Sequence, residues 1–205
     1  MAQQPIYDAE GEQLLMTRLW APQLADDPEA FVLFAFPWGQ PNTPLAKFKG
    51  PRTWQRKILR RIATHIKTNK GQVDMDALRT AVASGRGIGK SALVSWLVLW
   101  MLSTRIGSSV IVSANSEAQL RSVTWGELTK WQAMIINSHW WEISATKLIP
   151  AKWLTELVER DLKKGTRYWA AEGKLWSEEN PDSYAGVHNH DGMMLIFDEA
   201  SGIPD

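Results

Sequence analysis

Residues 81–92 read Ala81-Val-Ala-Ser-Gly-Arg-Gly-Ile-Gly-Lys-Ser-Ala92, and in this stretch a short apolar run passes into a glycine-rich turn. The turn ends in Lys90 and Ser91. The spacing follows the G-x-x-x-x-G-K-[ST] pattern of phosphate-binding loops, except that Ser84 stands where the pattern has its first glycine. The stretch therefore predicts a phosphate-binding loop. The alternative is a glycine-rich surface turn with an incidental lysine.

The residue types in this loop suit an anion. Gly85, Gly87 and Gly89 allow positive φ and let backbone N–H groups approach a phosphate closely. A helix that begins near Gly89 would add its unpaired first-turn N–H groups and the positive end of its dipole. Lys90 would then reach the β- and γ-phosphates, and the Ser91 hydroxyl would bind Mg²⁺.

A second motif closes the chain, Met193-Met-Leu-Ile-Phe-Asp-Glu-Ala200. Five consecutive apolar residues predict a strand that is buried on both faces, with two carboxylates at its C-terminal end. Asp198 would hold Mg²⁺ through coordinated waters, and Glu199 would polarise the water that attacks the γ-phosphate. Such a run is weak evidence alone, but it follows the glycine-rich loop by about a hundred residues, and the pair is strong evidence for an ATPase.

Between the two motifs the chain alternates strands and helices. We expect strands at residues 78–83 and 108–113, and helices at 91–102 and from Ser116 to about residue 137. This order predicts an α/β fold in which a right-handed parallel βαβ crossover carries the loop. Further strands are expected at 140–148 and 166–171, a helix at 152–162, a turn at 163–165 and irregular chain at 176–190.

The N-terminal part looks like a helical adaptor. Short helices are expected around residues 12–20 and after Asp27, the predicted N-cap, with Pro28 in the first helical position. A proline-rich loop at 36–44 follows. We therefore predict an arm at residues 1–45 and an ATPase core at 46–205.

Residues 47–70 form a basic block with nine Lys or Arg and no acidic residue. With Thr53 as N-cap, helical phasing places the apolar residues on one stripe and most of the cations on the other side. That basic face is either a solvated helix face or a surface for a phosphate backbone. Gln55 falls on the apolar side, where a bound adenine edge would satisfy it. The cations of the basic face are Arg56, Lys57, Arg60, Lys67 and Lys70.

Composition bounds the remaining possibilities. The 205 residues are 44% hydrophobic with a net charge of +1, so nothing global argues for nucleic acid. The absence of Cys excludes disulfides and thiol catalysis and fits a reducing, cytoplasmic compartment. No signal peptide is visible, and the most apolar segment, residues 92–102, is about half a membrane span, which indicates a buried helix. No membrane partner is expected, and most of the twelve Trp are expected in the core or facing a partner.

Some other polar residues have weaker functional interpretations. The triplet His188-Asn-His190 spells the name of a nuclease family but lacks its distributed metal ligands. A metal site of His188, His190 and Asp191 is the alternative to an irregular loop with a few polar residues. Arg86, inside the loop, would reach a γ-phosphate or point to solvent. Arg105 and Arg121 are looser candidates for an arginine finger that acts on a neighbouring subunit.

The two motifs together resemble the large terminase subunit of tailed bacteriophages, the ATPase that packages DNA into procapsids. Residues 84–91, with Ser84 and an Arg four residues before the Lys, are similar to the phosphate loop of that family. Three further segments resemble family segments, and the likeness covers about residues 45–205. These segments are Pro51-Arg-Thr-Trp-Gln55, Ser113-Ala-Asn-Ser-Glu-Ala-Gln119 and Tyr184-Ala-Gly-Val-His188.

The resemblance implies an ASCE-type P-loop NTPase with a mostly parallel sheet flanked by helices, incomplete at its C-terminus. It implies ATP and Mg²⁺ as ligands, double-stranded DNA, a portal protein and a small terminase subunit as partners, and self-association into a ring in the bacterial host cytoplasm. Because nothing like the family's nuclease domain is present, we expect a truncated piece, a split-gene product or a prophage remnant. The rivals are another ASCE ATPase such as a helicase, or a nucleotide-binding module without turnover. The implied catalytic residues are Lys90, Glu199 and Arg86, the metal ligands are Ser91 and Asp198, and the nucleotide-binding residues are Gln55, Ser84, Gly85, Arg86, Gly87, Ile88, Gly89, Lys90 and Ser91.

Overall fold

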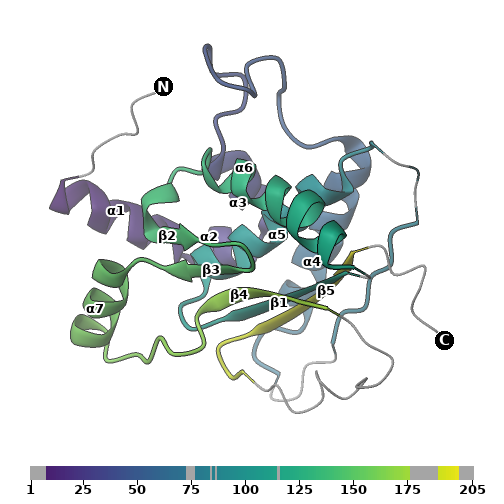
Figure 1. Cartoon of the computed structure of the whole chain (residues 1–205). Helices are drawn as coiled ribbons and strands as arrows, with labels where there is room; N and C mark the ends of the chain where they lie inside the picture. The colour runs from purple at the N-terminus through teal and green to yellow at the C-terminus, as the bar shows by residue number, and fades with distance from the viewer. Residues whose placement is uncertain are drawn as a thin grey trace. The chain divides into compact units, whose positions relative to one another are not determined.

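The computed structural model is α/β and describes residues 8–72, 77–83, 85, 87–114, 116–175 and 189–198. The chain divides into two compact units, residues 1–90 and 91–205, which are described one at a time below (Figure 1). The boundary predicted between residues 45 and 46 stays a prediction.

The described part of the first unit is helical. Its helix α3 begins as expected, because the Asp27 carboxylate accepts a 3.0 Å hydrogen bond from the Ala30 N–H and Pro28 occupies the first helical position. The predicted helix at 12–20 is present but begins three residues earlier, after Asp8. The basic block forms α4, whose first residue is Thr53, with Arg52 as N-cap. The helices are α1 (Ala9–Leu19), α2 (Pro22–Ala25), α3 (Pro28–Ala35) and α4 (Thr53–Thr68).

The strand predicted at residues 78–83 is wrong. Residues 77–83 have no regular secondary structure, and apart from the half-buried Leu78 their side chains are exposed. A strand persists only where a neighbouring strand binds its backbone, and short Ala81 and Ala83 offer little apolar surface to attach it. The predicted βαβ crossover that starts at this strand is therefore not formed by the described residues.

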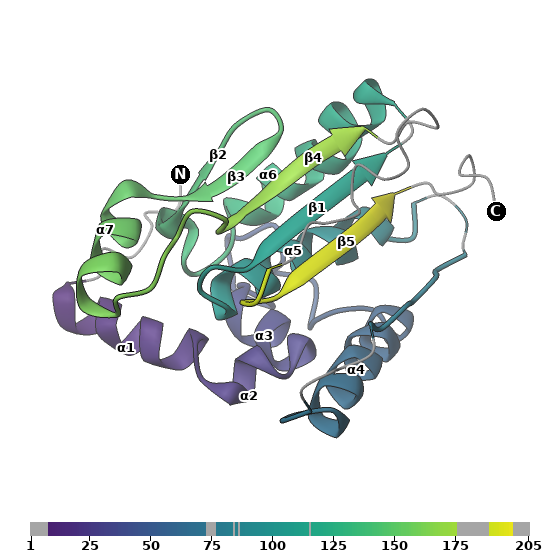
Figure 2. The same ribbon diagram turned by 90° about the horizontal axis from the view of Figure 1, so that it is seen from below.

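The second unit contains a five-stranded sheet in the order β2-β3-β4-β1-β5. Figure 2 shows β4, β1 and β5 running side by side in the same direction, whereas β3 pairs antiparallel with both β2 and β4. The sheet is thus mixed and not mostly parallel. The strands are β1 (Ser109–Ala114), β2 (Trp141–Ile143), β3 (Lys147–Pro150), β4 (Ala170–Leu175) and β5 (Met193–Asp198).

The single strand predicted at 140–148 is instead a hairpin, β2 and β3. The Ser144 N–H donates a 2.8 Å hydrogen bond to the Lys147 carbonyl, which closes the turn between the two strands. The helix that follows is confirmed as α7 (Lys152–Asp161). The next strand, β4, starts four residues later than predicted, because Thr166 accepts a backbone hydrogen bond from Trp169 in a turn.

Helix α5 (Lys90–Thr104) leaves the glycine-rich loop, and most of its side chains are buried, as expected. After β1, Ser116 accepts a hydrogen bond from the Gln119 N–H, and a π-helix (Gln119–Trp125) continues into α6 (Gly126–Gln132). The helical run ends five residues before the predicted residue 137. Both views place α5 and α6 over the same face of the sheet (Figures 1 and 2). Among the described residues, no helix has the length and apolar character needed to cross a bilayer.

Tryptophan supplies much of the core of the second unit. Trp96 of α5 meets Trp131 of α6 edge to face with ring centroids 5.0 Å apart, and Trp141 meets Trp169 in the same way at 5.5 Å. Such pairs bury large apolar areas with a defined geometry. The core role expected for most of the twelve Trp is thereby confirmed for seven of them, which are Trp96, Trp100, Trp125, Trp131, Trp140, Trp141 and Trp169.

Among the described strands, β5 lies at one edge of the sheet, and it is not buried on both faces. Leu195 and Phe197 point to one face and are each 42% exposed, whereas Asp198 points to the face that carries the π-helix and is only 7% exposed. The five apolar residues form the predicted strand. Its place at the edge of the sheet explains the difference in burial.

Candidate functional site

The glycine-rich loop adopts part of the conformation expected of a phosphate-binding loop. Gly87 and Gly89 have φ of +72° and +92°, in the left-handed region that favours glycine, whereas Gly85 does not. Helix α5 starts directly afterwards at Lys90. The predictions for Ser84 and Arg86 lie outside the described residues.

Gln55 is buried on α4, as expected, and its partners belong to the chain itself. It is only 3% exposed. Its amide oxygen accepts a 2.8 Å hydrogen bond from the Arg52 N–H, and its amide nitrogen donates a 2.8 Å hydrogen bond to the Gly89 carbonyl. The adenine contact stays a prediction, but Gln55 needs no ligand to satisfy its amide.

Arg52 makes a second connection between α4 and the loop. Its Nη1 donates a 3.3 Å hydrogen bond to the carbonyl of Ile88. An added Cβ on Gly89 would lie 2.9 Å from the Gln55 amide nitrogen, so a larger residue would displace this amide, and the φ of +92° also favours glycine. The start of α4 therefore contacts two successive carbonyls of the loop.

Within the second unit, α5 runs antiparallel to the three parallel strands. Its last turn lies at the strands' N-terminal ends, because the Met101 carbonyl accepts a 3.0 Å hydrogen bond from Ser108 and the Leu102 carbonyl one of 3.0 Å from Trp169. A helix of this length extends about 20 Å, similar to a six-residue strand. The first turn of α5, which contains Ser91, therefore lies toward the C-terminal ends of the parallel strands, where β5 ends in Asp198.

Asp198 is a buried carboxylate with one hydroxyl donor. Thr124, from the π-helix, donates a hydrogen bond of 2.6 Å to its Oδ2, and Thr124 is itself buried. Although both ends are described, no hydrogen bond joins Ser91 to Asp198. The predicted catalytic Glu199 lies outside the described residues.

The donor set at this edge fits magnesium. Mg²⁺ keeps several waters and takes one or two protein oxygens together with phosphate oxygens. A serine hydroxyl on the helix and an aspartate at the strand end match that preference. In the described part of the chain, no group of three His, Asp or Glu gathers as a larger metal site.

Most cations of the basic face form ion pairs with carboxylates of the chain itself. Arg56 and Arg60 each place Nε 2.5 Å from a different oxygen of Glu29 on α3. Burial raises the pKa of Glu29, but hydrogen bonds from Arg60 and Arg56 and their positive charges outweigh it, so that its pKa is lowered. Two further ion pairs, Lys67 with Asp27 and Lys70 with Asp26, lie at 2.8 and 2.6 Å.

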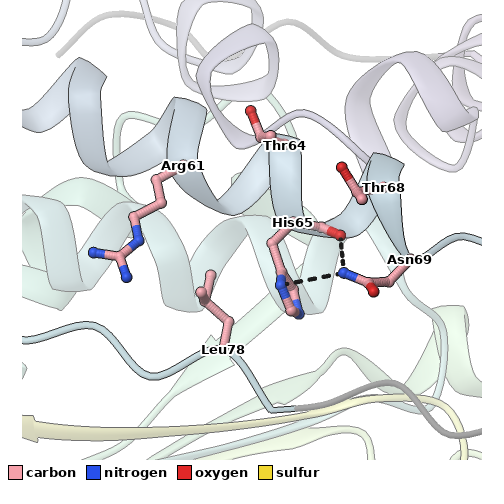
Figure 3. A pocket seen from close by; sticks show the side chains of 6 residues that line it. All are labelled: Arg61, Thr64, His65, Thr68, Asn69 and Leu78. Carbon is pink, nitrogen blue, oxygen red and sulfur yellow. Dashed lines mark hydrogen bonds between the residues drawn. The ribbon is translucent and has the colours of Figure 1, made fainter.

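A shallow hollow of about 440 Å³ lies along another side of α4 (Figure 3). Figure 3 shows Arg61 and His65 extending from the helix on the side of Leu78, with Asn69 donating a hydrogen bond to the His65 carbonyl at 2.8 Å. The described residues offer Arg61 no carboxylate. Arg61 and Lys57, one turn apart, are thus the α4 cations outside the ion pairs.

The looser candidates have local roles. The Arg105 guanidinium stacks 4.3 Å from the Trp100 ring, and Arg121 pairs with Glu117 at 2.7 Å. Asp191 pairs with Lys164 at 2.7 Å, and His188 lies outside the described residues. These contacts give structural explanations for three of the side chains.

Sequence reasoning missed Thr124 and Arg52. Nothing in the local pattern marks Thr124, because its partner Asp198 is 74 residues away. Arg52 has a usable signal, since it stands three residues before a glutamine at the start of an amphipathic helix, as in a capping arrangement.

Comparisons of the chain with protein-family models, with curated proteins and with solved structures found no match.

Proposed function

We propose that the chain is the ATP-binding and hydrolysing motor part of a viral DNA-packaging terminase, which couples ATP hydrolysis to the movement of duplex DNA into a procapsid. The observation that carries the proposal is the arrangement in the second unit. There, α5 follows a glycine-rich loop, and its first turn, with Ser91, lies toward the C-terminal ends of the parallel strands, where β5 ends in the buried Asp198. Ligand sites of α/β sheets lie at this edge.

Each residue has a role in the proposed chemistry. Lys90 would neutralise the β- and γ-phosphates, while Ser91 and Asp198 would hold a magnesium ion, which would supply further positive charge there. Glu199 takes a proton from the attacking water, and Arg86 stabilises the charge that develops on the γ-phosphate. Phosphoryl transfer needs positioning and charge neutralisation more than covalent chemistry, so these groups suffice in kind. The portal protein, the small terminase subunit and ring formation follow from the resemblance.

A second candidate is a nucleotide-binding module without turnover. The observation that favours it is the irregular, exposed chain at residues 77–83. A loop without a strand in front of it is less firmly positioned, and catalysis is more sensitive to position than binding is.

Phosphate release measured with Mg²⁺ and ATP, with and without duplex DNA, tests both candidates. The motor predicts release that DNA stimulates and that Glu199→Gln abolishes. ATP binding with no release in either condition supports the binding module. A chain that binds no ATP at all contradicts both.

A further inference from the structure

The hydrogen bonds of Gln55 fix the orientation of its amide. Its oxygen faces an N–H donor on Arg52 and its nitrogen faces a carbonyl acceptor on Gly89, both at 2.8 Å. In the opposite orientation the amide NH2 would face the Arg52 N–H and the amide oxygen would face the Gly89 carbonyl, so neither pair could form a hydrogen bond. Both amide atoms of Gln55 are thus bound within the chain, and the side chain is only 3% exposed.

These bonds also orient the loop backbone. The carbonyls of Ile88 and Gly89 accept hydrogen bonds from Arg52 and Gln55. In a trans peptide the carbonyl and the following N–H point in opposite directions, and no cis peptide occurs in the described chain. The N–H groups of Gly89 and Lys90 therefore both point away from the two side chains that hold the carbonyls.

Two successive N–H groups aimed to one side form an anion-binding nest, and here they lie at the first turn of α5, where the helix dipole is positive. The positive φ of Gly89 makes this peptide orientation accessible. Because glycine adopts many other conformations as readily, hydrogen bonds to the Ile88 and Gly89 carbonyls favour the binding conformation before a ligand arrives.

We propose that Gln55, assisted by Arg52, is a positioning residue that orients the phosphate-binding backbone of the loop. The inference rests on the proposed nucleotide-binding function and deepens it. It predicts that Gln55 affects the binding of any polyphosphate ligand, whatever its base.

The test compares affinity for ATP, GTP and inorganic tripolyphosphate by calorimetry in the presence of Mg²⁺. Gln55→Glu keeps the acceptor for Arg52 but turns an oxygen toward the Gly89 carbonyl, so affinity for all three ligands falls by a similar factor, about tenfold. Arg52→Ala gives a smaller loss that is likewise shared by all three. Gln13→Glu, an exposed site on α1, is the matched control and leaves all affinities unchanged.

Amide hydrogen exchange without ligand provides a second readout. Gln55→Glu speeds exchange in peptides that cover residues 85–91 and leaves β1 unaffected, whereas a general loss of folding would speed both. Unchanged exchange in the loop, or a loss of ATP affinity that spares GTP and tripolyphosphate, overturns the positioning role. A wild-type chain that binds none of the three ligands refutes the proposed function, and the inference with it.

Discussion

The hydroxyl of Thr124 donates a 2.6 Å hydrogen bond to the carboxylate of Asp198, and both groups are buried in the second unit. The bond connects the π-helix to the C-terminal end of β5. It occupies one oxygen of Asp198, and among the described residues no donor reaches the other oxygen, which is proposed to hold the metal.

Replacing the two partners should separate catalysis from packing. Asp198→Asn removes the charge proposed to hold Mg²⁺, so ATP hydrolysis should fall about 100-fold or more. Thr124→Val removes only the donor and should lower the free energy of unfolding by about 1–3 kcal/mol, since a buried acceptor loses its partner. Phosphate release and urea unfolding measure the two effects. Equal hydrolysis in Asp198→Asn and wild type would contradict the metal assignment.

Glu29 should make folding sensitive to acid. Because its pKa is lowered below the ordinary value of 4.5 in the folded chain, the stabilisation is fully present above pH 4.5. It is lost as the pH falls through the lowered pKa. Glu29→Gln should lower the free energy of unfolding by about 1–2 kcal/mol at pH 7 and flatten its dependence on pH below 4.5.

Chemical denaturation at pH 7 and at about pH 3 measures the Glu29 effect. The matched control is Glu156→Gln, an exposed carboxylate on α7 whose partner Lys152 lies 3.5 Å away. It should leave both curves unchanged. The ion-pair interpretation fails if Glu29→Gln and the control behave alike.

Duplex DNA should be contacted by Lys57 and Arg61, the cations of α4 that form no ion pair among the described residues. Lys57→Ala and Arg61→Ala should each lower DNA affinity and reduce the slope of log affinity against log salt by about one unit. Substitutions at Arg56 or Arg60 would mix binding with the loss of the Glu29 pairs. Fluorescence anisotropy across a salt series measures the slope, with Lys152→Ala on α7 as control. Slopes identical to wild type would show that this side of α4 faces solvent and does not contact DNA.

Gly173 should be required for packing of the π-helix. An added Cβ at this position in β4 would lie 3.1 Å from both Leu120 and Trp125. Gly173→Val should therefore lower the free energy of unfolding by about 1–3 kcal/mol. Gly126→Ala, at a helical site with open space around it, should raise it by about 0.5–1 kcal/mol. Thermal melts of both variants test this contrast, and a tolerated valine would contradict it.

The local elements were largely predictable. Asp27 and Pro28 mark the start of α3, and the apolar runs around Leu99 and Ile111 predict a buried helix and a buried strand, because caps and periodicity act over a few residues. The prediction at residues 78–83 failed because a strand depends on a partner elsewhere in the chain. The same applies to β5, whose composition could not reveal that it lies at the edge of the sheet.

Tertiary contacts determine which partners the cations of α4 have. Helical phasing separates Arg56 and Arg60 from the apolar stripe, but their partner Glu29 is far away in sequence and no local pattern announces it. The sequence therefore left a choice between a solvated face and a phosphate-binding face. In the structure, Arg56 and Arg60 do neither, because they form ion pairs with Glu29.

The glycine-rich loop, the helix that leaves it and the strand that ends in Asp198 could be predicted locally, because glycine conformations, helix starts and apolar runs depend on neighbouring residues. The side chains that hold these elements in place come from distant parts of the chain. Gln55 meets Gly89, and Thr124 meets Asp198, through hydrogen bonds between residues 34 and 74 positions apart. Such contacts depend on the path of the whole chain, since a hydrogen bond requires two atoms within about 3 Å whatever their separation in sequence.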